Sequence, residues 1–298
     1  MSRFRNYLSL VKFSHTLFAL PFAMIGFFLG IFGQKTVHEV KSPGTPVLLF
    51  RFFLVLICMV TARRAAMAFN RYLDRRFDAR NPRTAIREIP RGIIAPSSAL
   101  RFVIVCCLLF MVSCWFINPL CFYLSPVALF VILFYSYTKR FTALCHLVLG
   151  IGLSLAPIGA FLAVTGRFEM LPLMFSGAVI CWVSGFDIIY ALQDEDFDKS
   201  ENLYSIPTVV GKKQSLRISG FLHVLCAIFV ILAGITGGFG VWYWAGMLIF
   251  AGMLIYQHTL VKPNDLSRVN LAFMTANGIA SVVFALFVIA DMFITHKH

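Results

Sequence analysis

Nine blocks of apolar residues, each about 20 residues long, most constrain the fold of this chain. They cover residues 15–33, 47–69, 99–117, 119–137, 143–165, 171–191, 217–238, 240–260 and 271–293. A helix of that length crosses a bilayer, and the blocks lack the alternation of strands in a membrane barrel. With 59% hydrophobic and 13% charged residues, the chain is far less charged than soluble domains. The sequence predicts an all-α bundle of about nine transmembrane helices, one domain spanning residues 1–298.

The basic residues predict how this bundle is oriented. With the amino terminus inside, the inner segments are residues 1–14, 70–98, 138–142, 192–216 and 261–270. Together with the adjoining helix ends they hold 21 of the 26 Lys and Arg residues. The positive-inside rule therefore predicts an inside amino terminus and an outside carboxyl terminus, as nine spans require. This distribution explains the net charge of +13 without a nucleic-acid partner. We expect an integral multi-pass protein, in the cytoplasmic (inner) membrane if the source is bacterial.

Seven of the 13 acidic residues lie in two short stretches, at the inner ends of the second and sixth spans. The first stretch places polar groups at i, i+4 and i+8, namely Asn70, Asp74 and Asp78. The second places them at i, i+3, i+7 and i+11, namely Asp187, Tyr190, Asp194 and Asp198. On a continuous helix each set shares one face, where like charges four residues apart destabilise the helix unless a cation neutralises them.

Mg²⁺ is the expected cation, because it takes carboxylate oxygens and keeps coordination positions for phosphate oxygens. Two carboxylate sets facing each other would hold Mg²⁺ against a diphosphate and neutralise it as a leaving group. The alternative is a solvated helix end at which the acidic residues pair with Arg71, Arg75 and Arg76. Two clusters with the same spacing on the same side of the membrane argue against that alternative. For Glu195 and Asp196, which point away from the second face, we expect only a solvated position.

The two stretches resemble the Asp-rich motifs of the UbiA superfamily of intramembrane prenyltransferases. The pattern N-x-x-x-D-x-x-x-D at 70–78 matches the first motif, and Y-x-x-x-D-x-x-x-D at 190–198 matches the second. Further similar segments are HTLFALP at 15–21, DARNPRT at 78–84 and YSYTKR at 135–140. The pattern is most similar to the 4-hydroxybenzoate polyprenyltransferase branch. One departure is the Asn-Arg pair at 70–71, where many relatives have Asn-Asp.

This resemblance implies a nine-helix enzyme that transfers a polyprenyl group from a polyprenyl diphosphate to an aromatic acid. The implied acceptor is 4-hydroxybenzoate, in ubiquinone or menaquinone biosynthesis. The implied Mg²⁺ ligands are Asn70, Asp74, Asp78, Asp194 and Asp198. Cytoplasmic active-site loops are expected near 70–98 and 192–216, with the polyprenyl tail in an apolar tunnel open to the bilayer. Beyond lipid and substrates, no obligatory protein partner is evident.

Basic and aromatic side chains are expected to hold the substrates. Lys139 and Arg140, at the inner end of the fourth span, are placed to clamp phosphate oxygens, with ordinary positive-inside anchoring as the alternative. Arg63 and Arg64 lie deep enough in the second span to be costly without a function. Either would bind phosphate or the acceptor's carboxylate, and Arg64 lies nearer the face that carries Asn70. The amide of Asn70, on that face, and the hydroxyl of Tyr190, in the second motif, are also expected to bind the substrate.

The reaction itself needs no nucleophilic side chain. Asp74 and Asp194 would assist ionisation of the diphosphate through the metal, and the acceptor ring would attack ortho to its hydroxyl. Asp187 is a candidate for orienting that phenol or taking its proton. Two other prenyl transfers on the same fold remain open, a haem O synthase-like reaction and prenylation of dihydroxynaphthoate. A membrane transporter is the alternative of a different class, but transporter acids lie near mid-bilayer rather than at one face.

Overall fold

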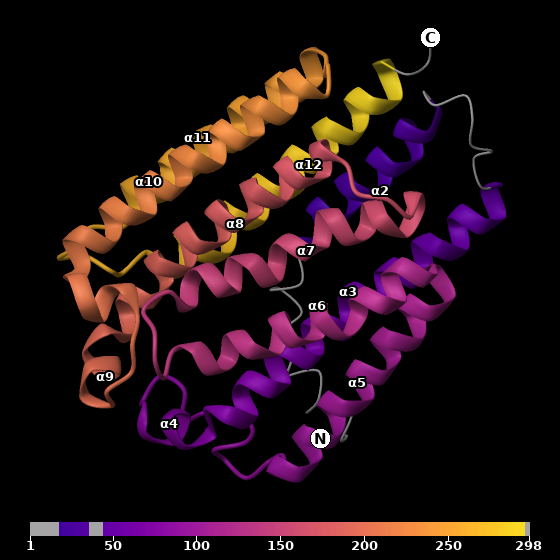
Figure 1. The fold of residues 1–298 in the computed structure, drawn as a ribbon. Helices are drawn as coiled ribbons and strands as arrows, with labels where there is room; N and C mark the ends of the chain where they lie inside the picture. Colours follow the sequence, from indigo (N-terminus) through magenta and orange to yellow (C-terminus); the bar gives the residue numbers. More distant parts are fainter. Residues whose placement is uncertain (1–17, 36–43, 296–298) are drawn as a thin grey trace.

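The computed structural model describes residues 18–35 and 44–295. Within them, each predicted apolar block corresponds to a long helical element, and no strand is present, which confirms the all-α prediction. These elements are α2 (Ala19–Lys35), α3 (Thr45–Leu73), α5 (Pro96–Ile117), α6 (Pro119–Thr138), α7 (Cys145–Thr165), α8 (Met170–Ala191), α10 (Ile206–Thr236), α11 (Val241–Leu260), and the π-helix η3 (Leu271–Ala276) continued by α12 (Asn277–Thr295). The helices run roughly side by side in one bundle (Figure 1).

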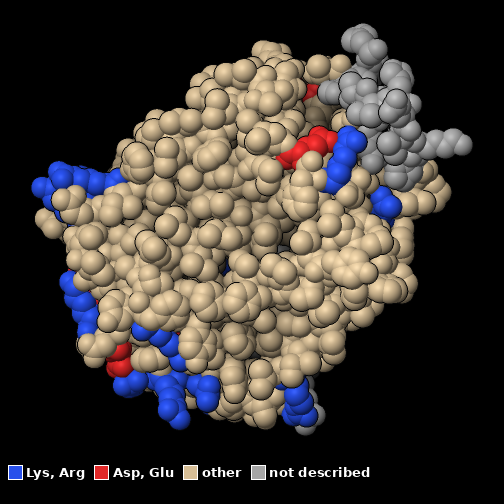
Figure 2. Space-filling view, in the orientation of Figure 1, with Lys and Arg blue, Asp and Glu red and all other residues tan. Residues whose placement is uncertain are grey.

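Seven of the described helices are long and apolar enough to cross a membrane; α2 is shorter as described, and α11 is less apolar. Large apolar side chains on their outer faces are exposed, among them Phe53, Trp115, Phe130, Leu248 and Leu286. Figure 2 shows a broad uncharged surface, with Lys and Arg gathered mainly along its lower left edge. The protein is therefore an integral multi-pass membrane protein, whose exposed apolar surface meets lipid.

Local sequence sets where several helices begin. Proline occupies the first turn of α3, α5, α6 and α10, where its missing N–H removes no helix hydrogen bond. Asn118 alone separates α5 from α6, and its side chain accepts a hydrogen bond from the backbone N–H of Cys121. At the start of α10, Ser205 and Thr208 form a reciprocal capping box. These caps allow the short connections that keep neighbouring helices antiparallel.

The main core is aromatic and joins α2, α8, α10, α11 and α12. Trp182 and Phe22 are fully buried there, with ring centroids 5.3 Å apart. α8 packs against both α7 and α10, while α3 packs against α5 on the other side of the bundle (Figure 1). Gly26 of α2 lies against α7, where an added Cβ would fall 2.0 Å from the Pro157 carbonyl oxygen. A glycine is therefore required for this close approach of the two helices.

Both acidic stretches break their helices, so the expectation of continuous helical faces is wrong. α3 ends at Leu73, and α4 (Arg75–Arg80) follows Asp74, which has φ −88° and ψ 5°. α8 ends at Ala191, and a 3₁₀ turn (η2, Leu192–Asp194) leads into α9 (Glu195–Ser200), with Asp194 at φ −104° and ψ 3°. The central aspartate of each motif thus forms the junction of two helices, in the sparsely populated bridge region typical of many active-site residues.

The two motifs come together at one end of the bundle. α4 and α9 lie side by side at the lower left in Figure 1, below the ends of the long helices, and Arg80 pairs with Glu201 at 2.8 Å. Of the two predicted loops, 192–216 is largely helical, since α9 and the start of α10 lie in it. A break at Gly211, whose φ of 76° suits glycine, divides α10. The loop after the first motif, 81–95, is a series of turns.

Candidate active site

The first motif is held by a cation from the segment directly after α6. Asn70 donates from Nδ2 to Asp74 Oδ2 at 3.0 Å, one turn further along the chain. Arg140 reaches Asp74 Oδ1 at 3.3 Å and also donates to the Leu73 carbonyl at 3.0 Å. Burial, and then the charge of Asp78, raise the pKa of Asp74 to about 6, although Arg140 and Lys139 oppose this shift. At Asp74, burial therefore outweighs the positive charge nearby.

The second motif is bound by a side chain from the loop after the first. Arg83 donates from Nε to Asp194 Oδ1 at 3.1 Å and from Nη2 to Asp194 Oδ2, and its Nη1 donates to the Tyr190 hydroxyl at 2.9 Å. Burial lowers the pKa of Arg83, but the charges and hydrogen bonds of Asp194 and Tyr190 outweigh it and raise this pKa. Asn81 adds a longer contact of 3.4 Å to Asp194. The loop that follows the first motif thus binds the second motif.

The segment directly after α6 contacts both motifs through consecutive residues. Lys139 Nζ lies 2.7 Å from Asp198 Oδ2, and Arg140 binds Asp74. Asp198 itself is buried. Burial lowers the pKa of Lys139, but the charge of Asp198 outweighs it and raises this pKa. The predicted phosphate-binding residues are therefore at the site, where they neutralise carboxylates.

Asp78 is bound by an arginine from the loop that follows the first motif. Both of its oxygens accept from Arg87 Nη1, at 2.8 and 2.9 Å, and the side chain is buried. Its role as a metal ligand remains a prediction, and the pair with Arg87 would have to open first. Two of the three arginines that the alternative pairs with the motifs have other partners: Arg71 pairs with Glu88, and Arg75 donates to the Tyr72 carbonyl.

The donor set suits Mg²⁺, although the protein alone does not complete a coordination shell. Among the described residues, no three His, Cys, Asp or Glu side chains gather around one point as metal ligands would. Asp198 Oδ2 is buried and lies 2.7 Å from Lys139 Nζ, so it would serve as a metal ligand once that ammonium turns away. Mg²⁺ commonly takes one or two carboxylates and completes its shell with water and substrate phosphates. The motif carboxylates and the raised pKa of Asp74 fit that mode.

Asp187 lies on α8, one turn before Tyr190. Its Oδ2 is 2.7 Å from His146 Nδ1, on α7, and its side chain keeps partial exposure. Its charge also interacts with Arg63 of α3 and Tyr135 of α6. Asp187 thus connects the motif end of the bundle with side chains from three other helices.

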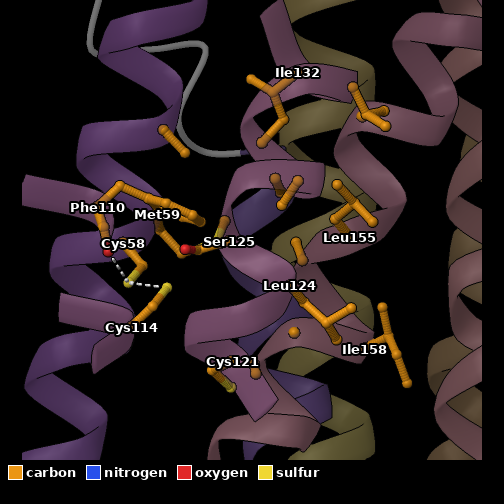
Figure 3. Close-up of a pocket in the computed structure, with 18 of the residues that line it drawn as sticks. Cys58, Met59, Phe110, Cys114, Cys121, Leu124, Ser125, Ile132, Leu155 and Ile158 are labelled. Carbon is orange, nitrogen blue, oxygen red and sulfur yellow. Dashed lines mark hydrogen bonds between the residues drawn. The ribbon is translucent and has the colours of Figure 1, made fainter. Parts of the chain in front are cut away.

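An apolar cavity of about 320 Å³ lies between α3, α5, α6 and α7. Figure 3 shows its wall, with Cys58 and Cys114 on one side and Leu124, Leu155 and Ile158 on the other. Its few polar lining residues are Arg63, Ser125 and Tyr135.

Arg63, rather than Arg64, therefore faces this cavity. Its buried Nε has no hydrogen-bond partner in the described part of the chain. Arg64 interacts with Cys106 of α5 instead, so the preference for Arg64 finds no support in the geometry.

Several side chains at this site were not singled out from the sequence: Asn81, Arg83, Arg87, Tyr135 and His146. The segment 78–84 and the segment 135–140 had already drawn attention by their similarity to the family, which is the signal that pointed to the first four or their neighbours. His146 carried no such signal, because its partner lies 41 residues away on another helix. Of the predicted residues in the segment 15–21, His15 lies outside the described residues.

Comparisons with known proteins agree with this geometry. Residues 19–282 match the model of the UbiA prenyltransferase family. A 4-hydroxybenzoate octaprenyltransferase of Burkholderia ambifaria is 31% identical over 287 residues, covering 96% of this chain and 95% of that protein. A 4-hydroxybenzoate octaprenyltransferase of Nitrosomonas europaea is 31% identical over 257 residues, covering 85% of each chain.

Solved structures show the same fold. A UbiA homologue from Aeropyrum pernix K1 superimposes with a TM-score of 0.78 at 28% identity, over 96% of this chain and 99% of that one. A UbiA homologue from Archaeoglobus fulgidus bound to GPP and Mg²⁺ gives a TM-score of 0.72 at 19% identity, over 96% of this chain and 99% of that one. With a family match over most of its length and relatives at this level of identity, the chain belongs to the UbiA prenyltransferase family.

Proposed function

We propose that this protein transfers a polyprenyl group from a Mg²⁺-bound polyprenyl diphosphate to 4-hydroxybenzoate, in the biosynthesis of a respiratory quinone. The observation that carries the proposal is the arrangement at the end of the bundle where the two motifs meet. Two aspartate motifs, each paired with basic side chains, lie beside an apolar cavity with a buried arginine in its wall. The names of the relatives support the acceptor, and the bound GPP and Mg²⁺ of the archaeal homologue support the donor and metal.

The diphosphate would bind between the motifs. Asn70, Asp74, Asp194 and Asp198 would hold Mg²⁺, with Asp78 joining them if Arg87 releases it. When bound, Mg²⁺ neutralises charge on the departing diphosphate. Lys139, Arg140 and Arg83 lie within reach of the same space and would turn from carboxylates to phosphate oxygens, to which guanidinium groups bind in bidentate fashion. Tyr190, already bound to Arg83 at 2.9 Å, would follow that movement.

The acceptor carries a carboxylate and a hydroxyl at opposite ends of its ring. Arg63 offers a buried guanidinium with an unpartnered Nε, which matches the carboxylate. Asp187 offers a carboxylate oxygen to the hydroxyl and takes its proton as the ring attacks the prenyl carbon. The apolar cavity between α3, α5, α6 and α7 would hold the start of the prenyl chain and exclude water from the allylic cation.

Location follows from the same proposal. The motif end would face the cytoplasm, with the amino terminus inside and the carboxyl terminus outside. In a bacterium the membrane would be the inner one. The residues 1–298 would act as one membrane domain whose active-site segments lie near 70–98 and 192–216.

The test uses the purified protein in lipid, with geranyl diphosphate and 4-hydroxybenzoate, with and without Mg²⁺. Formation of prenylated hydroxybenzoate that requires Mg²⁺ and is lost in both Asp74→Ala and Asp194→Ala is the expected result. Dihydroxynaphthoate and haem serve as competing acceptors, and a preference for either would reassign the acceptor. Failure to bind geranyl diphosphate in the presence of Mg²⁺ would refute the proposed reaction altogether.

A further inference from the structure

One side chain of this site has a role that the family motifs do not describe. His146 stands on the first turn of α7, next to Asp187 of α8, and is almost fully buried. Its Nδ1 lies 2.7 Å from Asp187 Oδ2. A buried histidine inside a membrane protein is costly unless both ring nitrogens are satisfied, and a buried polar pair in a span is functional by default.

The other ring nitrogen decides which proton His146 carries. The backbone N–H of Ile206, in the first turn of α10, points at His146 Nε2 at 3.4 Å. A backbone N–H only donates, so Nε2 is the acceptor and the imidazole proton lies on Nδ1. His146 therefore donates to Asp187. The Ser184 hydroxyl also donates to the His146 carbonyl at 3.1 Å, which ties α8 to α7 beside the pair.

This bond leaves part of Asp187 free. In the described residues, the bond to His146 is the one hydrogen bond that the Asp187 side chain makes. One carboxylate oxygen is thus fixed and the other is open to a ligand. A base held by a third group is the arrangement by which enzymes orient a proton acceptor.

Resting on the proposed function, we propose that His146 is a positioning residue for prenyl transfer: its Nδ1–H holds one oxygen of Asp187, so that the other oxygen meets the hydroxyl of the aromatic acceptor. His146 itself does not touch the substrate. Its effect is on where Asp187 points.

The protons and electrons of the step balance. The bond between the prenyl carbon and the diphosphate oxygen breaks, and its electron pair leaves with the diphosphate. The ring carbon ortho to the hydroxyl forms the new carbon–carbon bond while the hydroxyl proton passes to Asp187, giving a dienone. Asp187 then returns its proton to the oxygen as the ring carbon loses its own proton to diphosphate or water. Aromaticity is restored, and one proton is released overall.

Two substitutions of His146 test this role: one keeps an N–H donor, and the other keeps the side-chain volume without a donor. His146→Asn keeps an N–H near the position of Nδ1, whereas His146→Leu keeps volume without a donor. We expect the Leu variant to lower kcat/KM for the acceptor about 10- to 100-fold, with KM for geranyl diphosphate within about twofold. The Asn variant should recover most of that loss. His223→Leu is the matched control, since His223 is another buried histidine packed on α8, but it bonds to His258 at 2.8 Å and lies near the Trp182 carbonyl rather than Asp187.

A double-mutant cycle with Asp187→Asn gives the second readout. If His146 acts through Asp187, adding His146→Leu to Asp187→Asn costs nothing further. Wild-type activity in the Leu variant would overturn the proposal, as would an equal loss for both substrates in the Leu and Asn variants, or additive losses in the cycle. The Asn variant decides the question alone if the Leu variant does not fold, because a loss as large as that of Asp187→Asn refutes it. An inactive wild-type protein would instead refute the proposed function, so the two failures are distinguishable.

Discussion

The raised pKa of Asp74 makes binding of the metal and diphosphate depend on pH. Burial and the charge of Asp78 raise this pKa to about 6 from its ordinary value of 3.8. A shift of roughly two units corresponds to about 3 kcal/mol of opposition to ionisation. A proton and Mg²⁺ compete for the same oxygens. Binding that needs the carboxylate is therefore weak at low pH and strengthens as pH rises through about 6.

The size of the effect follows from the titration. About one-tenth of Asp74 is ionised at pH 5 and about nine-tenths at pH 7, so the apparent affinity should rise close to tenfold over this range. The measurement is Mg²⁺-dependent binding of geranyl diphosphate to protein in lipid nanodiscs, from pH 5 to pH 8.

Asp78→Asn provides the control, because the diphosphate's own titration is the same for both proteins. Removing the charge of Asp78 takes away the second cause of the raised pKa and leaves Arg87 unpaired nearby. The midpoint of the pH dependence should therefore fall below that of the wild type. A midpoint that stays in place, or moves upward, would refute this account of Asp74.

Three further predictions concern other parts of the bundle. Arg63→Ala should raise KM for the acceptor about 10- to 100-fold in steady-state assays, from the loss of one charge-assisted contact, whereas Arg64→Ala should have little effect. Gly159 lines the cavity with open space where a Cβ would be, so Gly159→Leu should shorten the longest prenyl chain accepted; Gly252→Leu, equally open but away from the cavity, should not change the products. Asp291 accepts from the backbone N–H groups that begin α11, so Asp291→Ala should cost about 1–3 kcal/mol in thermal unfolding without altering either KM.

The long helices were predictable because lipid imposes one solution on an apolar run of 20 residues: its backbone must bond to itself. The breaks at Asp74 and Asp194 were not, because the four-residue spacing of the motifs is that of an unbroken helix. What the spacing misses is that each aspartate ends one helix and precedes another at an angle. Tertiary bonds from Arg140 and Arg83 hold these junctions, and such bonds are not visible in local sequence.

Some residues of the candidate site were also predictable from the sequence, and others were not. Its carboxylates could be named from sequence, since few acidic residues occur and they cluster. The choice between Arg63 and Arg64 could not be made, because one residue is a rotation of about 100° around a helix and only packing sets that rotation. The pair of His146 and Asp187 likewise depends on how α7 lies against α8. Contacts between side chains of different helices therefore could not be predicted from the sequence.

Lys139 and Arg140 pair with carboxylates of opposite motifs, and this pairing lowers the desolvation free energy of the charged groups at the site. Before substrate arrives, the site is an internal salt, in which each fixed anion already has a fixed counter-ion. A Mg²⁺ diphosphate would bind as a second salt. Mg²⁺ would then pair with the carboxylates, while the ammonium of Lys139 and the guanidinium of Arg140 would pair with the phosphate oxygens. Because ions are swapped rather than stripped, neither the empty nor the filled site leaves bare charge at the edge of the hydrocarbon. Release of diphosphate is the same exchange run backwards, so the protein recovers its own counter-ions as the product departs.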